Sequence, residues 1–160
     1  MPSSWPGCAP TEPAERDRGQ RDDAGAANGS HARRLALYVE DNPLNRLLMT
    51  QIFELYEDWS LVCAEDGEAG IEALSRERPQ VVLIDMRLPD ISGVELLARM
   101  RGTDAGRGIP YVLVTAEVPA STESATEDEP RFDRVIYKPF DASGIVPEIA
   151  ALVDSFGPRA

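Results

Sequence analysis

Short, continuously apolar runs alternate along this chain with longer stretches in which apolar residues recur every three or four positions. The five runs cover residues 35–39, 61–64, 81–84, 111–114 and 135–137. Apolar runs of this length, without polar alternation, are typical of strands that have helices on both faces of their sheet. Strands that alternate with helices predict βαβ units, so the pattern predicts an α/β domain with a parallel sheet.

Local signals mark where the intervening helices begin. Asn42 is followed by Pro43, a residue that the first turn of a helix tolerates. Asp66 and Gly67 open a second helix, Ser92 can cap a third, and Asp141 can cap the last one. In the first of these helices, apolar residues recur at helical spacing at Leu44, Leu48, Ile52 and Leu55.

Two helical stretches carry unfavourable residues. Residues 117–131 contain one large apolar residue, Val118, and prolines near both ends, so a short or irregular helix is expected there. Pro147 falls about six residues after the cap of the last helix, where proline removes a backbone donor. That helix is therefore expected to bend or to begin late.

Composition divides the chain and narrows its class. Residues 1–32 are rich in proline and small residues without periodicity, and predict a disordered tail before a domain at 33–156 and a short tail at 157–160. The net charge of −12 argues against binding a nucleic-acid backbone, and no apolar run approaches the length of a membrane span. Two cysteines without a metal motif favour a reducing cytoplasm.

Polar residues with related chemistry follow the predicted strands. Glu40 and Asp41 follow the first strand, Asp85 the third, Thr115 the fourth and Lys138 the fifth. Because the carboxyl ends of parallel strands share one edge of the sheet, these residues are expected to converge there. Three carboxylates that converge repel one another, so at least one of them should have a raised pKa. Mg²⁺ would relieve the repulsion, and the chemistry implied is phosphoryl transfer to a carboxylate.

Lys138 is also the only lysine of the chain, among 16 basic residues. A general preference for arginine would explain the rarity of lysine. The position of this lysine at a strand end suggests in addition that a compact ammonium is wanted there instead of a planar guanidinium.

These motifs resemble the receiver domain of response regulators in two-component signalling. The resemblance is carried by Tyr-Val-Glu-Asp-Asn-Pro at 38–43, Val-Leu-Ile-Asp-Met-Arg-Leu-Pro-Asp-Ile-Ser-Gly at 82–93, Val-Thr-Ala at 114–116 and Tyr-Lys-Pro-Phe at 137–140, and it covers about residues 34–156. It implies a flavodoxin-like, doubly wound (βα)5 fold with a five-stranded parallel sheet in the order 2-1-3-4-5. It also implies a phosphoprotein of the cytoplasm that uses Mg²⁺ and takes its phosphoryl group from a histidine kinase or a histidine phosphotransferase.

Residue roles follow from the same resemblance. Asp85 would accept the phosphoryl group. Asp41 would bind Mg²⁺ directly and Glu40 largely through water, while Asp85 and the backbone carbonyl of Arg87 would complete the protein ligands. Lys138 would contact the phosphoryl group, Thr115 would move toward it, and the bond from Lys138 to Pro139 is often cis in this family.

One position departs from the family pattern. Receivers usually carry Tyr or Phe three residues before the lysine, and this chain has Val135 there. Tyr137 directly precedes the lysine and is interpreted as lying on a different face of the strand, because side chains alternate along a strand. The departure puts the coupling of Thr115 to an aromatic ring in question.

Three functions are compatible with these residues. The first is a phosphoryl-accepting receiver that signals by contact with a downstream protein, either a stand-alone receiver or a phosphorelay shuttle, since few residues follow position 156. The second is a phosphatase with an aspartyl-phosphate intermediate. Such enzymes usually have a second aspartate two residues after the nucleophile, where this chain has Arg87, so the only reactions expected are the protein's own phosphorylation and dephosphorylation. The third is a degenerate receiver that acts as a phosphorylation-independent binding scaffold.

Overall fold

The computed structural model describes residues 32–116 and 130–157 of the chain. The predicted disordered tail at 1–32 lies outside this range except for its last residue. Most of the weak helical stretch at 117–131 also falls outside it. The fourth βα unit, which follows β4, therefore stays a prediction in its helical part.

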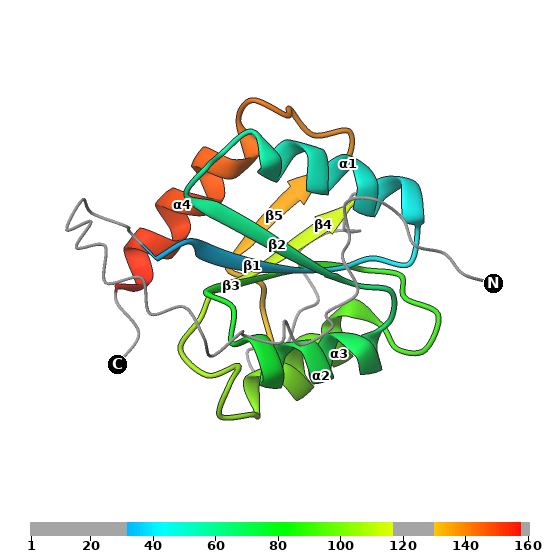
Figure 1. Ribbon diagram of the computed structural model, residues 1–160. Coiled ribbons are helices and arrows are strands. Elements are labelled where there is room, and N and C mark those ends of the chain that lie inside the picture. Colours follow the sequence, from blue (N-terminus) through cyan, green and yellow to red (C-terminus); the bar gives the residue numbers. More distant parts are fainter. Residues whose placement is uncertain (1–31, 117–129, 158–160) are drawn as a thin grey trace, which may run out of the picture.

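A five-stranded parallel sheet forms the centre of the domain (Figure 1). Its strands lie in the order β2-β1-β3-β4-β5, which confirms the predicted doubly wound topology. Each predicted run is a strand, and each observed strand extends the run by one or two residues. The strands are β1 (Arg34–Val39), β2 (Trp59–Ala64), β3 (Val81–Asp85), β4 (Tyr111–Thr115) and β5 (Arg134–Tyr137).

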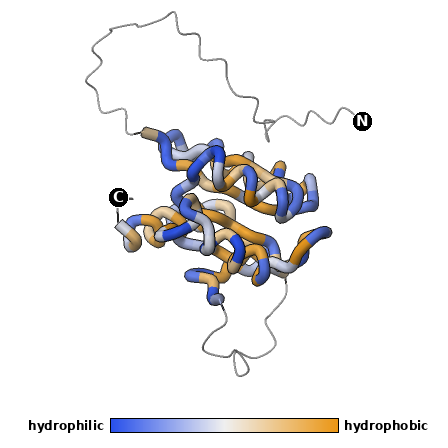
Figure 2. The backbone as a smooth tube through the Cα atoms, turned by 90° about the horizontal axis from the view of Figure 1, so that it is seen from below, coloured by the Kyte–Doolittle hydropathy of each residue, from blue (hydrophilic) through white to orange (hydrophobic). Residues whose placement is uncertain are grey.

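Four helices cover the two faces of the sheet in the described residues. They are α1 (Pro43–Glu54), α2 (Gly67–Glu77), α3 (Gly93–Arg101) and α4 (Ile145–Phe156). Helices α1 and α4 lie on one face, and α2 and α3 lie on the other (Figure 1). Figure 2 shows that the hydrophobic positions gather between these layers. Between their end residues the central strands are apolar, because both of their faces are buried in this way.

Three of the four predicted helix starts are confirmed. The side chains of Asn42, Asp66 and Ser92 accept hydrogen bonds from backbone N–H groups in the first turns of α1, α2 and α3. Asp141 does not cap α4, because its side chain closes a turn on Ser143 instead. Helix α4 begins late, at Ile145, which places Pro147 in its first turn, where the backbone N–H would have no helical partner.

The apolar stripe predicted for the first helix is not its buried face. Leu44, Leu48 and Leu55 are 69%, 46% and 73% exposed, and only Ile52 of that stripe is buried. The face of α1 that packs on the sheet is completed by Met49 and Phe53. Two apolar stripes thus run along α1, and spacing alone could not tell which of them meets the sheet.

Candidate functional site

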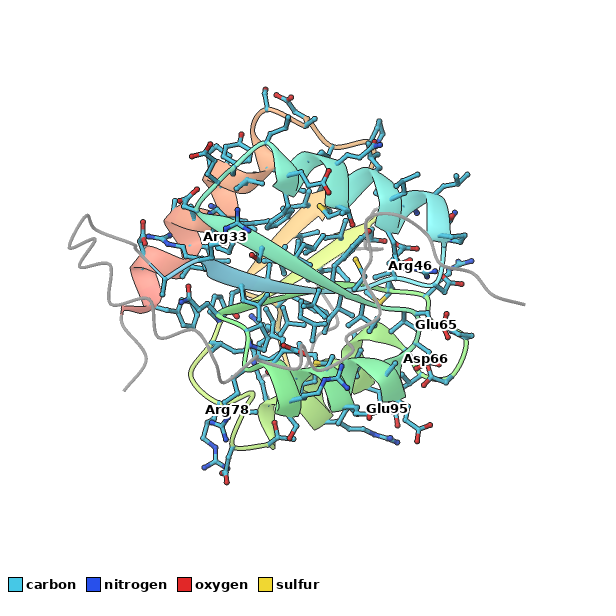
Figure 3. All side chains as sticks on the ribbon, viewed as in Figure 1. Arg33, Arg46, Glu65, Asp66, Arg78 and Glu95 are labelled. Atoms are coloured by element: carbon cyan, nitrogen blue, oxygen red, sulfur yellow. The ribbon has the colours of Figure 1, made fainter. Side chains whose placement is uncertain are left out.

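Loops that follow the carboxyl ends of the strands meet at one edge of the sheet. In Figure 3, Arg46, Glu65 and Asp66 mark this edge, whereas Arg33 and Arg78 lie at the opposite edge. Glu40 and Asp41 follow β1 at this edge, and Asp85 is the last residue of β3. Since β1 and β3 are neighbours in the sheet, the three carboxylates are brought together.

The three carboxylates form the only cluster of potential metal ligands among the described residues. One oxygen each from Glu40, Asp41 and Asp85 lies within 4.8 Å of the others. Carboxylate oxygens are the ligands that Mg²⁺ prefers. Glu40 is buried, Asp85 is partly buried and Asp41 is exposed, so the cluster opens to solvent on the side of Asp41. The donor set and its spacing fit a Mg²⁺ ion.

Lys138, which directly follows the edge strand β5, adds one positive charge to this cluster. Its Nζ lies 2.7 Å from Oε2 of Glu40 and 3.6 Å from Oδ2 of Asp85. The lysine side chain is 17% exposed, so these charges interact with little screening by water. The ammonium is therefore bound to Glu40 and stands next to Asp85.

The two buried carboxylates respond in opposite directions. Burial, together with the negative charge of Glu40, raises the pKa of Asp85 to about 6 against the opposing effect of Lys138. Burial also acts to raise the pKa of Glu40, but its hydrogen bonds to Lys138, Asn42 and Tyr38 outweigh burial and lower it. The expectation that one carboxyl group of the cluster has a raised pKa is confirmed at Asp85.

Arg46 fixes the loop that carries the first two acids. From α1, its guanidinium donates to the backbone carbonyl of Glu40 at 2.7 Å and to that of Asp41 at 2.9 Å. At the same time the backbone N–H of Asn42 donates to Oε1 of Glu40 at 3.2 Å. These bonds hold two consecutive acidic residues in one backbone conformation, with Glu40 directed inward.

Asp90 fixes the loop after Asp85. Its carboxylate accepts hydrogen bonds from the backbone N–H groups of Gly67 at 2.9 Å and Glu68 at 3.0 Å, so the β3–α3 loop is bound to the start of α2. At the other end of this loop, a Cβ on Gly93 would lie 2.7 Å from the backbone oxygen of Asp85. Only glycine allows α3 to begin this close to Asp85.

Arg87 lies in the same loop, two residues after Asp85. Its backbone N–H donates to Oδ1 of Asp85 at 3.4 Å, and the residue pairs with Ser92 in an isolated bridge. The position is thus adjacent to the acid cluster, as a backbone ligand would need to be. Ligation of a metal by its carbonyl stays a prediction.

Thr115 is the last residue of β4, at the same edge of the sheet as the acid cluster, and it is buried. The β4–β5 register pairs Thr115 with Tyr137, and Leu113 with Val135. Ile136, between them, belongs to the core under α1 and α4. Because side chains alternate, Val135 and Tyr137 share the opposite face of β5. The interpretation that Tyr137 lies on a different face from Val135 is wrong, since the two residues are separated by a full strand repeat.

The bond between Lys138 and Pro139 is cis, as the resemblance implied. Three further contributors to the site were missed from sequence: the Tyr38 hydroxyl, Arg46 and Asp90. Tyr38 precedes Glu40 by two positions, so strand alternation could have placed both on one face. For Arg46 and Asp90 no comparable sequence signal exists, because their partners are backbone groups positioned by the fold.

Comparison with known proteins agrees with this geometry. A sequence model of the response regulator receiver domain matches residues 36–150. The probable transcriptional regulatory protein TcrX of Mycobacterium tuberculosis is 32% identical over 126 residues, which cover 76% of this chain and 50% of that protein. Sporulation initiation phosphotransferase F of Bacillus subtilis is 32% identical over 80 residues, covering 50% of this chain and 62% of that protein.

Solved structures show the same fold. The receiver domain of the sensor histidine kinase PA1611 from Pseudomonas aeruginosa, solved with a magnesium ion coordinated in its active-site cleft, superposes with a TM-score of 0.67 at 22% identity. The match covers 77% of this chain and 99% of that one.

Two observations limit what these matches imply. The chain spans about half the length of the curated relatives it matches over most of its own length. Within the described residues, no helix is both long and apolar enough to cross a membrane. The matched residues 36–150 include the whole acid cluster and Lys138, and the chain belongs to the response regulator receiver domain family.

Proposed function

We propose that this receiver is phosphorylated on Asp85 in a Mg²⁺-dependent reaction, with a histidine kinase or a histidine phosphotransferase as the donor. The observation that carries the proposal is the shared position of Glu40, Asp41, Asp85 and Lys138 at one edge of the sheet. A magnesium ion in the active-site cleft of the PA1611 receiver supports the same reading of the acid cluster. The bound metal would supply charge neutralisation at the phosphoryl oxygens.

Asp85 is the residue suited to accept the phosphoryl group. It is less buried than Glu40 and less exposed than Asp41, and Lys138 stands 3.6 Å away. Attack by Oδ of Asp85 on phosphorus forms an O–P bond as the P–N bond to the donor histidine breaks. The leaving imidazole takes up a proton from water. With a pKa of about 6, the carboxyl group is mostly ionised, and thus nucleophilic, at neutral pH.

Lys138 and Thr115 would bind the product. The ammonium of Lys138 can reach an oxygen of a phosphoryl group on Asp85 by a charge-assisted hydrogen bond. Thr115 ends β4, the strand next to the one that carries Asp85, and would contribute its hydroxyl to the same group. Movement of Thr115 would displace Tyr137, its partner in the β4–β5 register. Tyr137 is 47% exposed, so a downstream protein could contact it.

Turnover of an external substrate is not part of the proposal. Arg87 occupies the place where an aspartyl phosphatase needs its second carboxylate, and arginine cannot act as an acid or base near neutral pH. The net charge of −12 supports signalling through protein contact by this segment and argues against direct binding to nucleic acid.

Labelling with acetyl phosphate tests the proposal. The wild-type chain should be phosphorylated in the presence of Mg²⁺, and EDTA or Asp85→Asn should abolish the label. Asp154→Asn is the matched control, because it removes a carboxylate from α4 at the opposite edge of the sheet, where Asp154 pairs with Arg34.

The outcomes separate the candidate functions. A label that persists in Asp85→Asn would show that another residue is the acceptor. Absence of label in the wild-type chain, from acetyl phosphate and from a histidine phosphotransferase alike, would favour the phosphorylation-independent scaffold. The specific observation on the side of that alternative is Val135, which replaces the usual aromatic residue.

A further inference from the structure

One buried hydroxyl group, that of Tyr38, is directed from the core at the acid cluster. Tyr38 lies in β1 and has no exposed surface, and its ring packs in the core layer under α1 and α4. Its hydroxyl donates to Oε2 of Glu40 at 2.9 Å. Since Tyr38 and Glu40 are two residues apart, strand alternation places them on the same face and makes this contact possible.

The oxygen that Tyr38 contacts is the one that Lys138 also contacts. Nζ of Lys138 donates to Oε2 of Glu40 at 2.7 Å, so this oxygen has two donors. The Glu40 residue is 1% exposed, and bulk water has little access to it. If Lys138 moves away from this oxygen, the Tyr38 hydroxyl therefore still donates to it.

Lys138 has two competing tasks. In the structure its ammonium is closer to Glu40 than to Asp85, by 2.7 Å against 3.6 Å. Binding a phosphoryl group on Asp85 requires the ammonium to turn toward that group. A buried carboxylate oxygen without a hydrogen-bond donor costs free energy. The movement of the lysine away from Glu40 is therefore unfavourable unless another group still donates to Glu40.

We propose that Tyr38 is a positioning residue, whose hydroxyl holds Oε2 of Glu40 when Lys138 turns from it to a phosphoryl group on Asp85. This inference rests on the proposed function of Asp85. The ring of Tyr38 is fixed by the core, so its hydroxyl stays in place during the exchange. Tyr38 thereby lowers the cost of moving the lysine, without touching the phosphoryl group itself.

A pair of tyrosine substitutions tests the proposal. Tyr38→Phe removes only the hydroxyl that faces Glu40. Tyr111→Phe is the matched control, because Tyr111 is equally buried and its hydroxyl donates at 2.8 Å to the backbone of Gly106, in the other core layer. The probe is beryllofluoride, which mimics a phosphoryl group on a carboxylate, titrated into the full chain at saturating Mg²⁺ and followed by NMR.

Tyr38→Phe should raise the half-saturating beryllofluoride concentration by roughly tenfold, the effect of one hydrogen bond to a charged group. Tyr111→Phe should change it by less than about twofold, although both variants lose a buried hydrogen bond. An equal change in the two variants, or none in Tyr38→Phe, would overturn the proposal.

A second measurement needs no phosphoryl group and so separates this inference from the proposed function. In EDTA, unfolding is measured for Tyr38→Phe, Lys138→Met and the double variant. With the lysine absent, the Tyr38 hydroxyl is the remaining donor to Oε2 in the described structure. The double variant should therefore lose more stability than the two single losses combined, by roughly tenfold in the unfolding equilibrium constant.

Additive losses in this cycle would show that Tyr38 does not support Glu40 in the absence of the lysine, and would overturn the inference even if Asp85 is phosphorylated. A non-additive cycle in a protein that takes neither label nor beryllofluoride would place the failure in the proposed function and leave Tyr38 as a structural support for Glu40 only. The exchange at Lys138 would then be disproved.

Discussion

The two edges of the sheet handle charge in different ways. At the amino-terminal edge, charges are matched one to one near solvent: Arg101 with Asp133, Arg34 with Asp154 and Arg134 with Glu148. At the carboxyl-terminal edge, three carboxylates lie together, and the ammonium of Lys138 pairs with two of them, Glu40 and Asp85. One edge is balanced and the other carries an excess of negative charge in a partly buried place.

Under the proposed function, the balanced edge contributes stability and the unbalanced edge carries the chemistry. Asp133 accepts hydrogen bonds from Arg101 and from the backbone of Tyr111, and so joins α3, β4 and the start of β5. Asp85 has no comparable compensation, and its pKa is raised to about 6 as a result. An unbalanced carboxylate costs stability at neutral pH, which is tolerable where an incoming cation or phosphoryl group needs it.

The largest effect is expected from Asp85→Asn, measured as stability against pH without Mg²⁺. The folded pKa of about 6 exceeds the ordinary value of 3.8, so the folded wild-type protein binds this proton more tightly than the unfolded chain. The associated stability is complete below about pH 4 and is lost as pH rises through about 6. Asp85→Asn should thus be more stable than wild type by up to about 3 kcal/mol at pH 8, and by little at pH 4.

Chemical denaturation at several pH values, with EDTA present, measures this difference. Saturating Mg²⁺ should shrink the advantage of Asp85→Asn at pH 8, because the metal relieves the same repulsion in the wild type. A variant that is less stable than wild type at pH 8 would contradict the view of this edge as unbalanced.

Asp133→Asn tests the balanced edge and should act in the opposite direction. It removes the charge that Arg101 and the backbone N–H of Tyr111 both contact, and should destabilise the protein by about 2 kcal/mol. Mg²⁺ affinity, measured by calorimetry, should stay at the wild-type value. Weaker Mg²⁺ binding in a folded Asp133→Asn protein would mean that the two edges are coupled.

Lys138→Arg sharpens the comparison at the unbalanced edge, because it keeps the charge and changes only its shape. The protein should fold with a loss of about 1 kcal/mol, since a guanidinium cannot reproduce the compact contact with Glu40. The response to beryllofluoride, followed by NMR at Thr115 and Tyr137, should be largely lost. A full response in this variant would indicate that any cation serves and that the single lysine reflects codon usage.

The smallest effect is expected from Asp154→Asn. Its pair with Arg34 is 62% exposed on the aspartate side, and exposed pairs contribute about 0–1 kcal/mol. The midpoint of thermal unfolding should fall by no more than about 4 °C, and phosphorylation should not change. A larger loss would show that the balanced edge depends on its surface pairs more than their exposure suggests.

Much of the site could be predicted because it follows from strand ends. Glu40, Asp85 and Lys138 each follow or end a short apolar run, and a parallel sheet brings such positions together whatever the details of packing. The helix caps at Asn42, Asp66 and Ser92 were also readable, since each acts on its own first turn.

Errors arose where one pattern allowed two arrangements. Helix α1 has two apolar stripes, and the exposed leucines belong to the one that does not meet the sheet. Asp141 is a residue type that often caps helices, but its carboxylate accepts a hydrogen bond from the backbone N–H of Ser143, and the helix begins only at Ile145. Tyr137 is one residue from the lysine but two residues from Val135, so it shares a face with Val135, and the β4–β5 register pairs it with Thr115.

Local periodicity and the residues that end each strand are enough to predict the strands, most of the helices and the edge at which the acids meet. Which atoms are in contact depends on the packed fold. Lys138 and Glu40 are 98 positions apart, and Arg46 and Asp90 bind backbone groups of other segments. Such contacts depend on distances of a few ångströms between separate segments, and only the packed fold sets those distances.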